Sequence, residues 1–147
     1  MSTEAIWVHL DPVIDHLRQN DLAYPDSASA ALTRAFGMMP ELQAFCREHL
    51  EELCPKEAGT TRFGRIAKDR RGFSVDAVVS SGRGMQHTHP RGEVNFCFAL
   101  ADEPRFDGDA PGWIVYAPGT RHPATVEGGT MFMIYFLPGG EIEWHRD

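Results

Sequence analysis

Apolar residues recur at helical spacing over roughly the first 55 residues of the chain. Asp11-Pro12 makes a favourable N-cap and first-turn pair ahead of several apolar residues, which predicts a short helix beginning there. A second helix is predicted over residues 28–36, ended by Gly37, because glycine tolerates the left-handed conformation that often follows a helix. The longest pattern covers residues 41–53, with mostly apolar residues at offsets of three, four, seven, eight and eleven, and predicts a third helix.

From about residue 60 the spacing of apolar residues changes to two, which is typical of β-strands. Strands are predicted at residues 73–79, 94–100, 113–116 and 131–137, each bounded by Gly, Pro or Asp. Several strands joined by glycine-rich turns indicate an antiparallel sandwich or barrel. Because no linker, repeat or low-complexity tract interrupts the chain, we expect one mostly β domain over residues 1–147. Residues 1–58 would form its helical N-terminal segment and residues 59–147 its barrel.

The composition narrows the classes of function. A formal net charge of −7 opposes binding to phosphate backbones, so nucleic acid is not an expected partner. No apolar run approaches the roughly 20 residues that span a bilayer, so no membrane insertion is expected. The N-terminus lacks the features of a secretory signal, and the three cysteines show no Cys-x-x-Cys pairing. Both features favour a cytoplasmic protein with reduced, buried thiols.

Three histidines and a glutamate form a candidate metal site. His87 and His89 are two apart on a predicted strand, so their side chains project from the same face. Glu93 follows a Pro-Arg-Gly segment that can bend the chain back toward them, and a Pro-Gly turn precedes His122 and would place it on a strand opposite the pair. The alternative is that each side chain is separately hydrogen-bonded or exposed. As a set, the four residues predict one divalent transition metal: iron, manganese, nickel, cobalt or zinc.

Two segments resemble the motifs of the cupin superfamily. Residues 82–93, Gly-Arg-Gly-Met-Gln-His-Thr-His-Pro-Arg-Gly-Glu, are similar to the first motif, which supplies three metal ligands in that superfamily. Residues 112–122, Gly-Trp-Ile-Val-Tyr-Ala-Pro-Gly-Thr-Arg-His, are similar to the second, with His122 in the position of the fourth ligand. The chain departs from the pattern in lacking a glycine at the usual distance after Glu93 and in placing the proline directly before the glycine. The resemblance implies a single cupin-type antiparallel β-barrel of jelly-roll form.

A narrower resemblance covers most of the chain. Residues 54–59, 62–69, 89–93, 112–119 and 137–145 are similar to small cupins grouped with 4-hydroxylaminobenzoate lyase. That resemblance implies a metal-dependent lyase of bacterial nitroaromatic breakdown, which converts 4-hydroxylaminobenzoate to 3,4-dihydroxybenzoate and releases ammonia. A divalent metal with open positions suits this chemistry, because it can polarise an oxygen or lower the pKa of bound water.

A benzoate substrate requires a cation, and we name Arg65 and Arg91 as candidates because guanidinium binds carboxylate in a bidentate manner. Tyr135 is a candidate to line the cavity and hydrogen-bond the substrate, and the ordinary alternative for all three is a structural or surface role. Three other functions stay open: a metal-dependent dioxygenase acting on an aromatic or small organic acid, a non-catalytic cupin that binds or senses a small acid, and a structural or subunit-interaction role for the barrel. We expect a homodimer, since exposed strand edges often pair between subunits.

Overall fold

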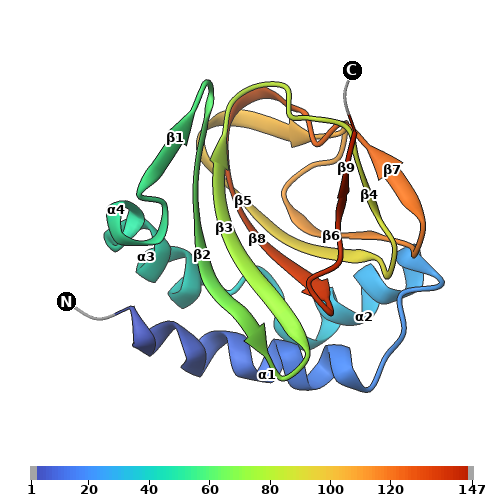
Figure 1. Ribbon diagram of the computed structural model, residues 1–147. Coiled ribbons are helices and arrows are strands. Elements are labelled where there is room, and N and C mark those ends of the chain that lie inside the picture. Colours follow the sequence, from blue (N-terminus) through green and yellow to red (C-terminus); the bar gives the residue numbers. More distant parts are fainter. Residues whose placement is uncertain (1–2, 146–147) are drawn as a thin grey trace.

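The computed structural model describes residues 3–145, and its helices precede its strands (Figure 1). The helical segment consists of a 3₁₀ turn, η1 (Glu4–Ile6), and of α1 (Trp7–Arg18), α2 (Pro25–Phe36), α3 (Pro40–Glu48) and α4 (Leu50–Leu53). The strands are β1 (Lys56–Ala58), β2 (Thr61–Arg70), β3 (Phe73–Ser80), β4 (His87–His89), β5 (Glu93–Phe106), β6 (Gly112–Tyr116), β7 (Thr120–His122), β8 (Val126–Pro138) and β9 (Glu143–Trp144).

The strands form two antiparallel sheets. The large sheet has six strands in the order β1-β2-β3-β8-β5-β6, and the small sheet has three in the order β7-β4-β9. In Figure 1 the small sheet lies on the right, beside the concave side of the curved large sheet. The predicted fold class is confirmed: the chain is mostly β, antiparallel and jelly-roll-like, and a helical segment precedes the strands.

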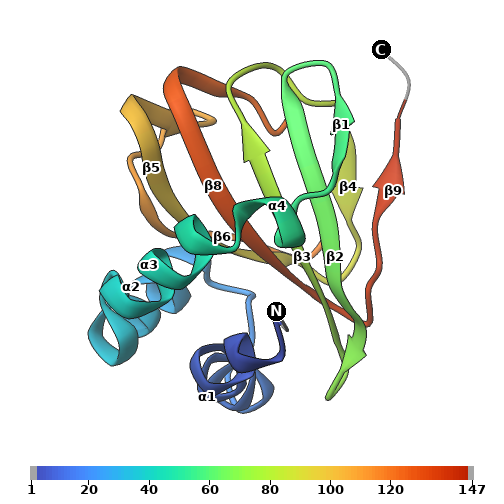
Figure 2. The same cartoon turned by 90° about the vertical axis from the view of Figure 1, so that its left-hand side faces the viewer.

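The large sheet has a helix face and an inner face, which follow from the period of two along each strand. On β8, Phe132, Ile134 and Phe136 belong to a core cluster shared with the helices, which gather on one side of the sheet (Figure 2). Their neighbours Met131 and Met133 belong to a second, smaller cluster on the inner face. Each fully buried side chain of this size stabilises the fold by about 1.5–3 kcal/mol. Burial of both faces therefore holds the inner face in a fixed position for the site described below.

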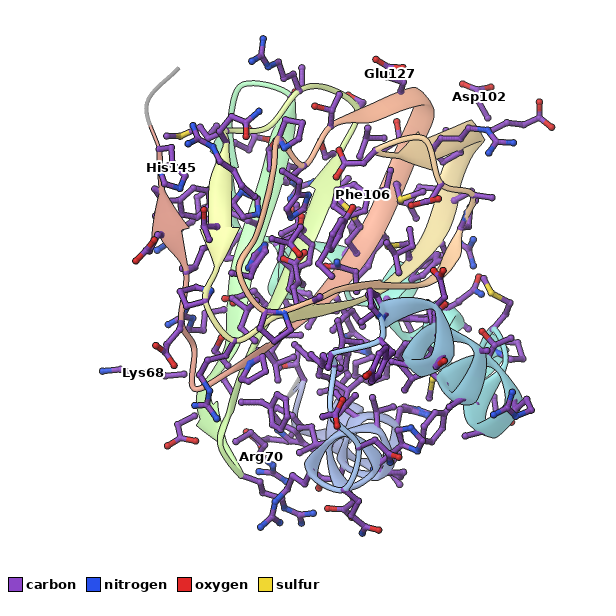
Figure 3. All side chains as sticks on the ribbon, turned by 90° about the vertical axis from the view of Figure 1, so that its right-hand side faces the viewer. Lys68, Arg70, Asp102, Phe106, Glu127 and His145 are labelled. Atoms are coloured by element: carbon purple, nitrogen blue, oxygen red, sulfur yellow. The ribbon has the colours of Figure 1, made fainter. Side chains whose placement is uncertain are left out.

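The helix α1 begins four residues before the start predicted at Asp11, so Pro12 lies inside it. Asp11 does not act as an N-cap; its carboxylate accepts hydrogen bonds from Nε and Nη2 of Arg70 at 3.0 and 2.8 Å. Pro12 lacks the amide hydrogen that would bond to the carbonyl of Val8. Because the Val8 residue is 74% exposed, water can solvate that carbonyl instead. The end of β2 that carries Arg70 lies against α1 (Figure 3).

The other helices also differ from the predicted ranges at their ends. α2 begins at Pro25 rather than at residue 28, with the proline in the first turn, where its missing amide hydrogen is not needed. The helix predicted over residues 41–53 is divided into α3 and α4 at His49, whose φ and ψ of −110° and 27° are not helical. The His49 ring is buried, and its Nδ1 lies 3.0 Å from a carboxylate oxygen of Glu52. The side-chain contact therefore accompanies the break.

The three cysteines are free and buried, in agreement with the prediction. No helix in residues 3–145 combines the length and the apolar character needed to cross a membrane. The homodimer, the cytoplasmic location and the domain limits stay predictions.

Candidate metal centre

The four predicted ligands converge from three strands. His87 and His89 lie on β4, Glu93 is the first residue of β5, and His122 is the last residue of β7. β4 and β7 pair in antiparallel register with His87 directly opposite His122, so these two rings project from the same face of the small sheet. One ligand atom from each of the four side chains lies within 4.8 Å of all the others. All four residues are buried.

The turn at Gly92 returns the chain so that Glu93 faces the histidines. Gly92 has a φ of 90°, a left-handed conformation that glycine adopts without strain. Its N–H donates a hydrogen bond to the carbonyl of His89 at 3.1 Å. A Cβ atom at this position would lie 2.9 Å from the carbonyl oxygen of Tyr116 and would force the two segments apart. The glycine therefore permits the tight return that places the carboxylate.

The spacing of the ligand atoms suits a shared metal ion. Nε2 of His89 lies 3.0 Å from Nε2 of His122, and the Glu93 carboxylate oxygens lie 3.0 and 3.3 Å from these two nitrogens. Ligands bound at about 2.0–2.2 Å from a transition metal stand roughly 2.8–3.6 Å from their neighbours in octahedral or tetrahedral geometry. The observed separations fall in that range.

The His87 ring presents an unpaired nitrogen to the same group. Its Nδ1 lies 2.9 Å from the carbonyl oxygen of Met85, so Nδ1 carries the hydrogen and Nε2 the lone pair of a neutral imidazole. Nε2 is buried and has no hydrogen-bond partner among the described residues. A buried acceptor without a partner is costly, and a metal ion would satisfy it. Because one imidazole nitrogen has no partner in the described part of the chain and the group offers three imidazoles and a carboxylate, the four residues fit a divalent transition metal.

The charge states of the ligands also favour a cation. Burial lowers the pKa of His87 to about 4, so the ring is neutral near pH 7. Burial alone would raise the pKa of Glu93, but hydrogen bonds from His122 and His89 outweigh it and lower that pKa to about 2. Burial likewise opposes the charged form of His122, yet the carboxylates of Asp107 and Glu93 raise its pKa to about 9. A metal ion would therefore have to displace a proton from His122.

Asp107 orients the His122 ring and was not predicted as a site residue. Nδ1 of His122 donates a 2.6 Å hydrogen bond to one carboxylate oxygen of Asp107, which also accepts a 2.7 Å bond from the hydroxyl of Tyr116. The other oxygen accepts the N–H of Thr125 at 2.8 Å. Once a metal ion has displaced the second ring proton, this arrangement directs the Nε2 lone pair of His122 at the ligand group. In the sequence, Asp107-Gly108 signals only a turn, and nothing local links it to His122.

Asn95 holds the carboxylate of Glu93 and was also missed. Its Nδ2 donates to Oε2 of Glu93 at 2.8 Å and to the carbonyl oxygen of Ile114 at 3.4 Å. A sequence signal for this contact exists, because a polar residue inside the apolar run of β5 is two positions from Glu93 and so shares its face.

Arg65 and Tyr135 lie in one row of directly paired residues across the inner face. The register connects Arg65 on β2 with Asp76 on β3, Asp76 with Tyr135 on β8, and Tyr135 with Asn95 on β5. Nε of Arg65 donates to Asp76 at 2.9 Å, and 53% of the arginine side chain is exposed. Within residues 3–145, the hydroxyl of Tyr135 contacts Sδ of Met133 at 3.9 Å. The row therefore connects the Arg65 guanidinium and the Tyr135 phenol to Asn95, the residue that holds Glu93.

The structure places Arg91 elsewhere. It lies in the turn between β4 and β5, and its Nε is 3.5 Å from a carboxylate oxygen of Glu141. Its side chain is 59% exposed. The contact with Glu141 pairs its charge at the surface, and no contact brings it to the four ligands within residues 3–145.

Solved structures of low similarity include an RmlC-like cupin protein from Ralstonia eutropha, with 17% identity, a TM-score of 0.45 and coverage of 61% of this chain and 62% of that one. A putative acetylacetone dioxygenase from Methylibium petroleiphilum has 16% identity, a TM-score of 0.45 and coverage of 58% and 66%.

Sequence comparison gives a closer relation. A 4-hydroxylaminobenzoate lyase of Pseudomonas putida is 33% identical over 98 residues, which are 63% of this chain and 56% of the relative. A 4-hydroxylaminobenzoate lyase of a Nocardioides species is 32% identical over 80 residues, or 49% and 47%. The chain thus spans about half the length of the curated relatives it matches. The family model described as 4-hydroxylaminobenzoate lyase matches residues 18–144. Because that match covers most of the chain, the protein belongs to the 4-hydroxylaminobenzoate lyase family.

Proposed function

We propose that this protein is a metal-dependent lyase that converts 4-hydroxylaminobenzoate, or a related small aromatic acid, to a dihydroxybenzoate and ammonia. The observation that supports it most is the convergence of His87, His89, Glu93 and His122 in a chain of this family. For the parent substrate the balance is one water consumed: hydroxylaminobenzoate plus water gives 3,4-dihydroxybenzoate plus ammonia. The net reaction requires no external oxidant or reductant.

The four side chains would hold one divalent transition metal, with Nε2 of each histidine and the Glu93 carboxylate as ligands. Such an ion, when bound, supplies Lewis acidity toward an oxygen of the substrate or of water. The protein holds three of the four ligands in place, each through a separate hydrogen bond. The Met85 carbonyl fixes the His87 ring, Asp107 fixes the His122 ring, and Asn95 fixes Glu93. This fixed geometry lowers the reorganisation that the reaction would otherwise require.

The chemistry asked of the site has two parts. The N–O bond of the substrate breaks and its hydroxyl leaves as water, while a water molecule adds at the neighbouring ring carbon. Hydrolysis of the resulting ring imine then releases ammonia, and the ring regains aromaticity as a catechol. The four buried ligands keep bulk water away from their side of the site.

We propose that Arg65 binds the substrate carboxylate and that Tyr135 donates a hydrogen bond to the substrate. With strands about 4.8 Å apart, the three steps of the row from Asn95 to Arg65 span roughly 14 Å of backbone. A long arginine side chain and a para-substituted benzoate can bridge that length together. Arg65 has to leave part of its pairing with Asp76 for this role, which its half-exposed position permits. The pairing of Arg91 with Glu141 does not favour Arg91 for the same role.

The test is turnover of 4-hydroxylaminobenzoate by the purified, metal-analysed protein with and without oxygen, following ammonia and 3,4-dihydroxybenzoate. The variant is His122→Ala, and the matched control is His9→Ala, which removes an imidazole from α1. We expect equal turnover with and without oxygen in the wild type and the control, and loss of both metal and turnover in His122→Ala.

Turnover only with oxygen, with oxygen consumed, would replace the lyase with a dioxygenase. A metal-loaded wild type that binds the acid without turnover in either condition would leave a non-catalytic binding protein. Full turnover by a metal-free protein would contradict the proposed role of the ligands.

A further inference from the structure

Trp144 lies beside the ligand group on a face where a buried side chain would be expected. It is on β9 and pairs in register with His87 on β4, so its ring projects from the same face as the His87 ring. The two ring centroids are 5.0 Å apart, with the ring planes at 57°. His87 is 1% exposed, whereas Trp144 is 60% exposed. The indole therefore contacts the site on one side and solvent on the other.

The exposure of Trp144 does not come from a loose strand. The next residue, His145, donates its backbone N–H to the carbonyl of Gln86 at 2.9 Å. Its Nε2 also lies 2.7 Å from the hydroxyl of Thr88, on the outer side of β4. In Figure 3, His145 lies beside β4 and β9 at the edge of the small sheet. The strand that carries Trp144 is thus attached to β4 on both sides of the indole's position.

A second aromatic side chain on an inward position is also partly exposed. Phe63 on β2 pairs in register with Val78, which packs in the inner-face cluster, so Phe63 projects from the inner face as well. It is 37% exposed. Side chains between two closed sheets are buried, as Phe106 is between the sheets (Figure 3). The exposure of Trp144 and Phe63, both at inward positions, therefore indicates that solvent reaches the inner face at these two strands.

We infer that Trp144 is the surface on which the aromatic ring of the substrate stacks as it approaches the ligand group. This inference rests on the proposed function for the aromatic-acid class of the ligand. An indole is the largest and most polarisable aromatic side chain, and offset stacking on it favours an aromatic ring over a saturated ring of the same size. Because Trp144 contacts the His87 ring, a substrate stacked on the indole would lie next to the metal-binding residues. Trp144 is thus a specificity-determining residue, and it selects the aromatic ring while Arg65 selects the carboxylate.

The test compares two unreactive acids, 4-hydroxybenzoate and cyclohexanecarboxylate, by calorimetric titration of the metal-loaded protein. Both carry one carboxylate on a six-membered ring, and only the first ring is aromatic. In Trp144→Leu we expect 4-hydroxybenzoate to bind about five- to tenfold more weakly and cyclohexanecarboxylate to change less than about twofold. Trp144→Phe should keep most of the affinity for 4-hydroxybenzoate. Tyr24→Leu is the matched control, because Tyr24 is a 74% exposed aromatic side chain outside the site.

Metal content and tryptophan emission are measured on the same samples. Addition of 4-hydroxybenzoate should change the emission of the wild type and not that of Trp144→Phe, because the remaining indoles lie on α1 and beneath α2. An equal loss of affinity for both acids in Trp144→Leu, with loss of metal, would show that the indole only supports His87 and would overturn the inference. Unchanged affinity, or no binding of 4-hydroxybenzoate by the metal-loaded wild type, would overturn it as well. Aromatic-selective binding lost in Trp144→Leu without any turnover by the wild type would refute the lyase and leave the stacking role intact.

Discussion

Replacing Asp107 with asparagine tests whether its carboxylate prepares His122 to bind metal. One carboxylate oxygen accepts hydrogen bonds from both the His122 ring and the Tyr116 hydroxyl, and the other accepts the N–H of Thr125. Asparagine supplies only one acceptor atom. If its NH₂ group faces His122, the ring must move its hydrogen to Nε2 and loses the metal-binding lone pair. If its oxygen faces His122, the NH₂ group opposes the N–H of Thr125. Either orientation disturbs the site.

The backbone allows this change to be made without added strain. Asp107 has a φ of 50°, in the left-handed region that asparagine adopts readily and that an alanine would not. The effect should therefore come from the lost acceptor and the lost charge. Changes to the outer partners of metal ligands typically weaken metal binding by about 10- to 100-fold, which corresponds to about 1.4–2.7 kcal/mol.

The assay is competition for Zn²⁺ and Co²⁺ between the protein and a chromophoric chelator, with circular dichroism to confirm folding. Asp109→Asn is the matched control, because it removes the same charge from the same turn at an exposed position. We expect the control to bind both metals within about twofold of the wild type, a change of no more than about 0.4 kcal/mol. Tyr116→Phe should fall between the two variants, since it removes one bond and keeps the carboxylate. Equal affinities for Asp107→Asn and Asp109→Asn would refute the argument that Asp107 positions His122.

Three other features of the structure can be tested: the raised pKa of His122, the position of Arg65 and the contact of Gly64 with α4. Because His122 has its pKa raised to about 9, the metal-free protein should lose stability as the pH rises from about 6.5 through 9. A stability that stays constant between pH 6.5 and 9 would contradict this pKa. For the same reason, metal binding at pH 7.5 should release close to one proton, which calorimetry in buffers of different ionisation enthalpy measures. Arg65→Gln should raise KM for 4-hydroxylaminobenzoate about 10- to 100-fold with little change in kcat, and leave the KM of the corresponding amide unchanged. Gly64→Ala should lower the free energy of unfolding in urea by about 1–3 kcal/mol, because its Cβ would collide with the carbonyl oxygen of Leu53; wild-type stability would show that α4 can shift.

The four candidate ligands could be grouped from the sequence because the required information is local. Two histidines two residues apart on a strand share a face in any β-structure, and the Pro-Arg-Gly segment before Glu93 contains the one residue that fits the return at Gly92. The spacing of apolar residues along β5 and β8 likewise predicted strands, and the structure shows that both of their faces are buried. The helix start was wrong at Asp11 because local capping preference competes with a distant partner, Arg70, which the sequence does not reveal.

The tertiary structure alone decided which residues support those ligands and where the site meets solvent. Asp107 is 15 residues from His122, and Arg65 reaches the row of Asn95 only through the order β2-β3-β8-β5. Trp144 reaches His87 because β9 pairs with β4, a contact between residues 57 positions apart. Strand spacing and period fix which residues share a face, but which strands become neighbours depends on the free energy of the whole packed sheet. The convergence of the four candidate ligands could therefore be predicted from their motif, whereas their hydrogen-bond partners and the indole beside them could not.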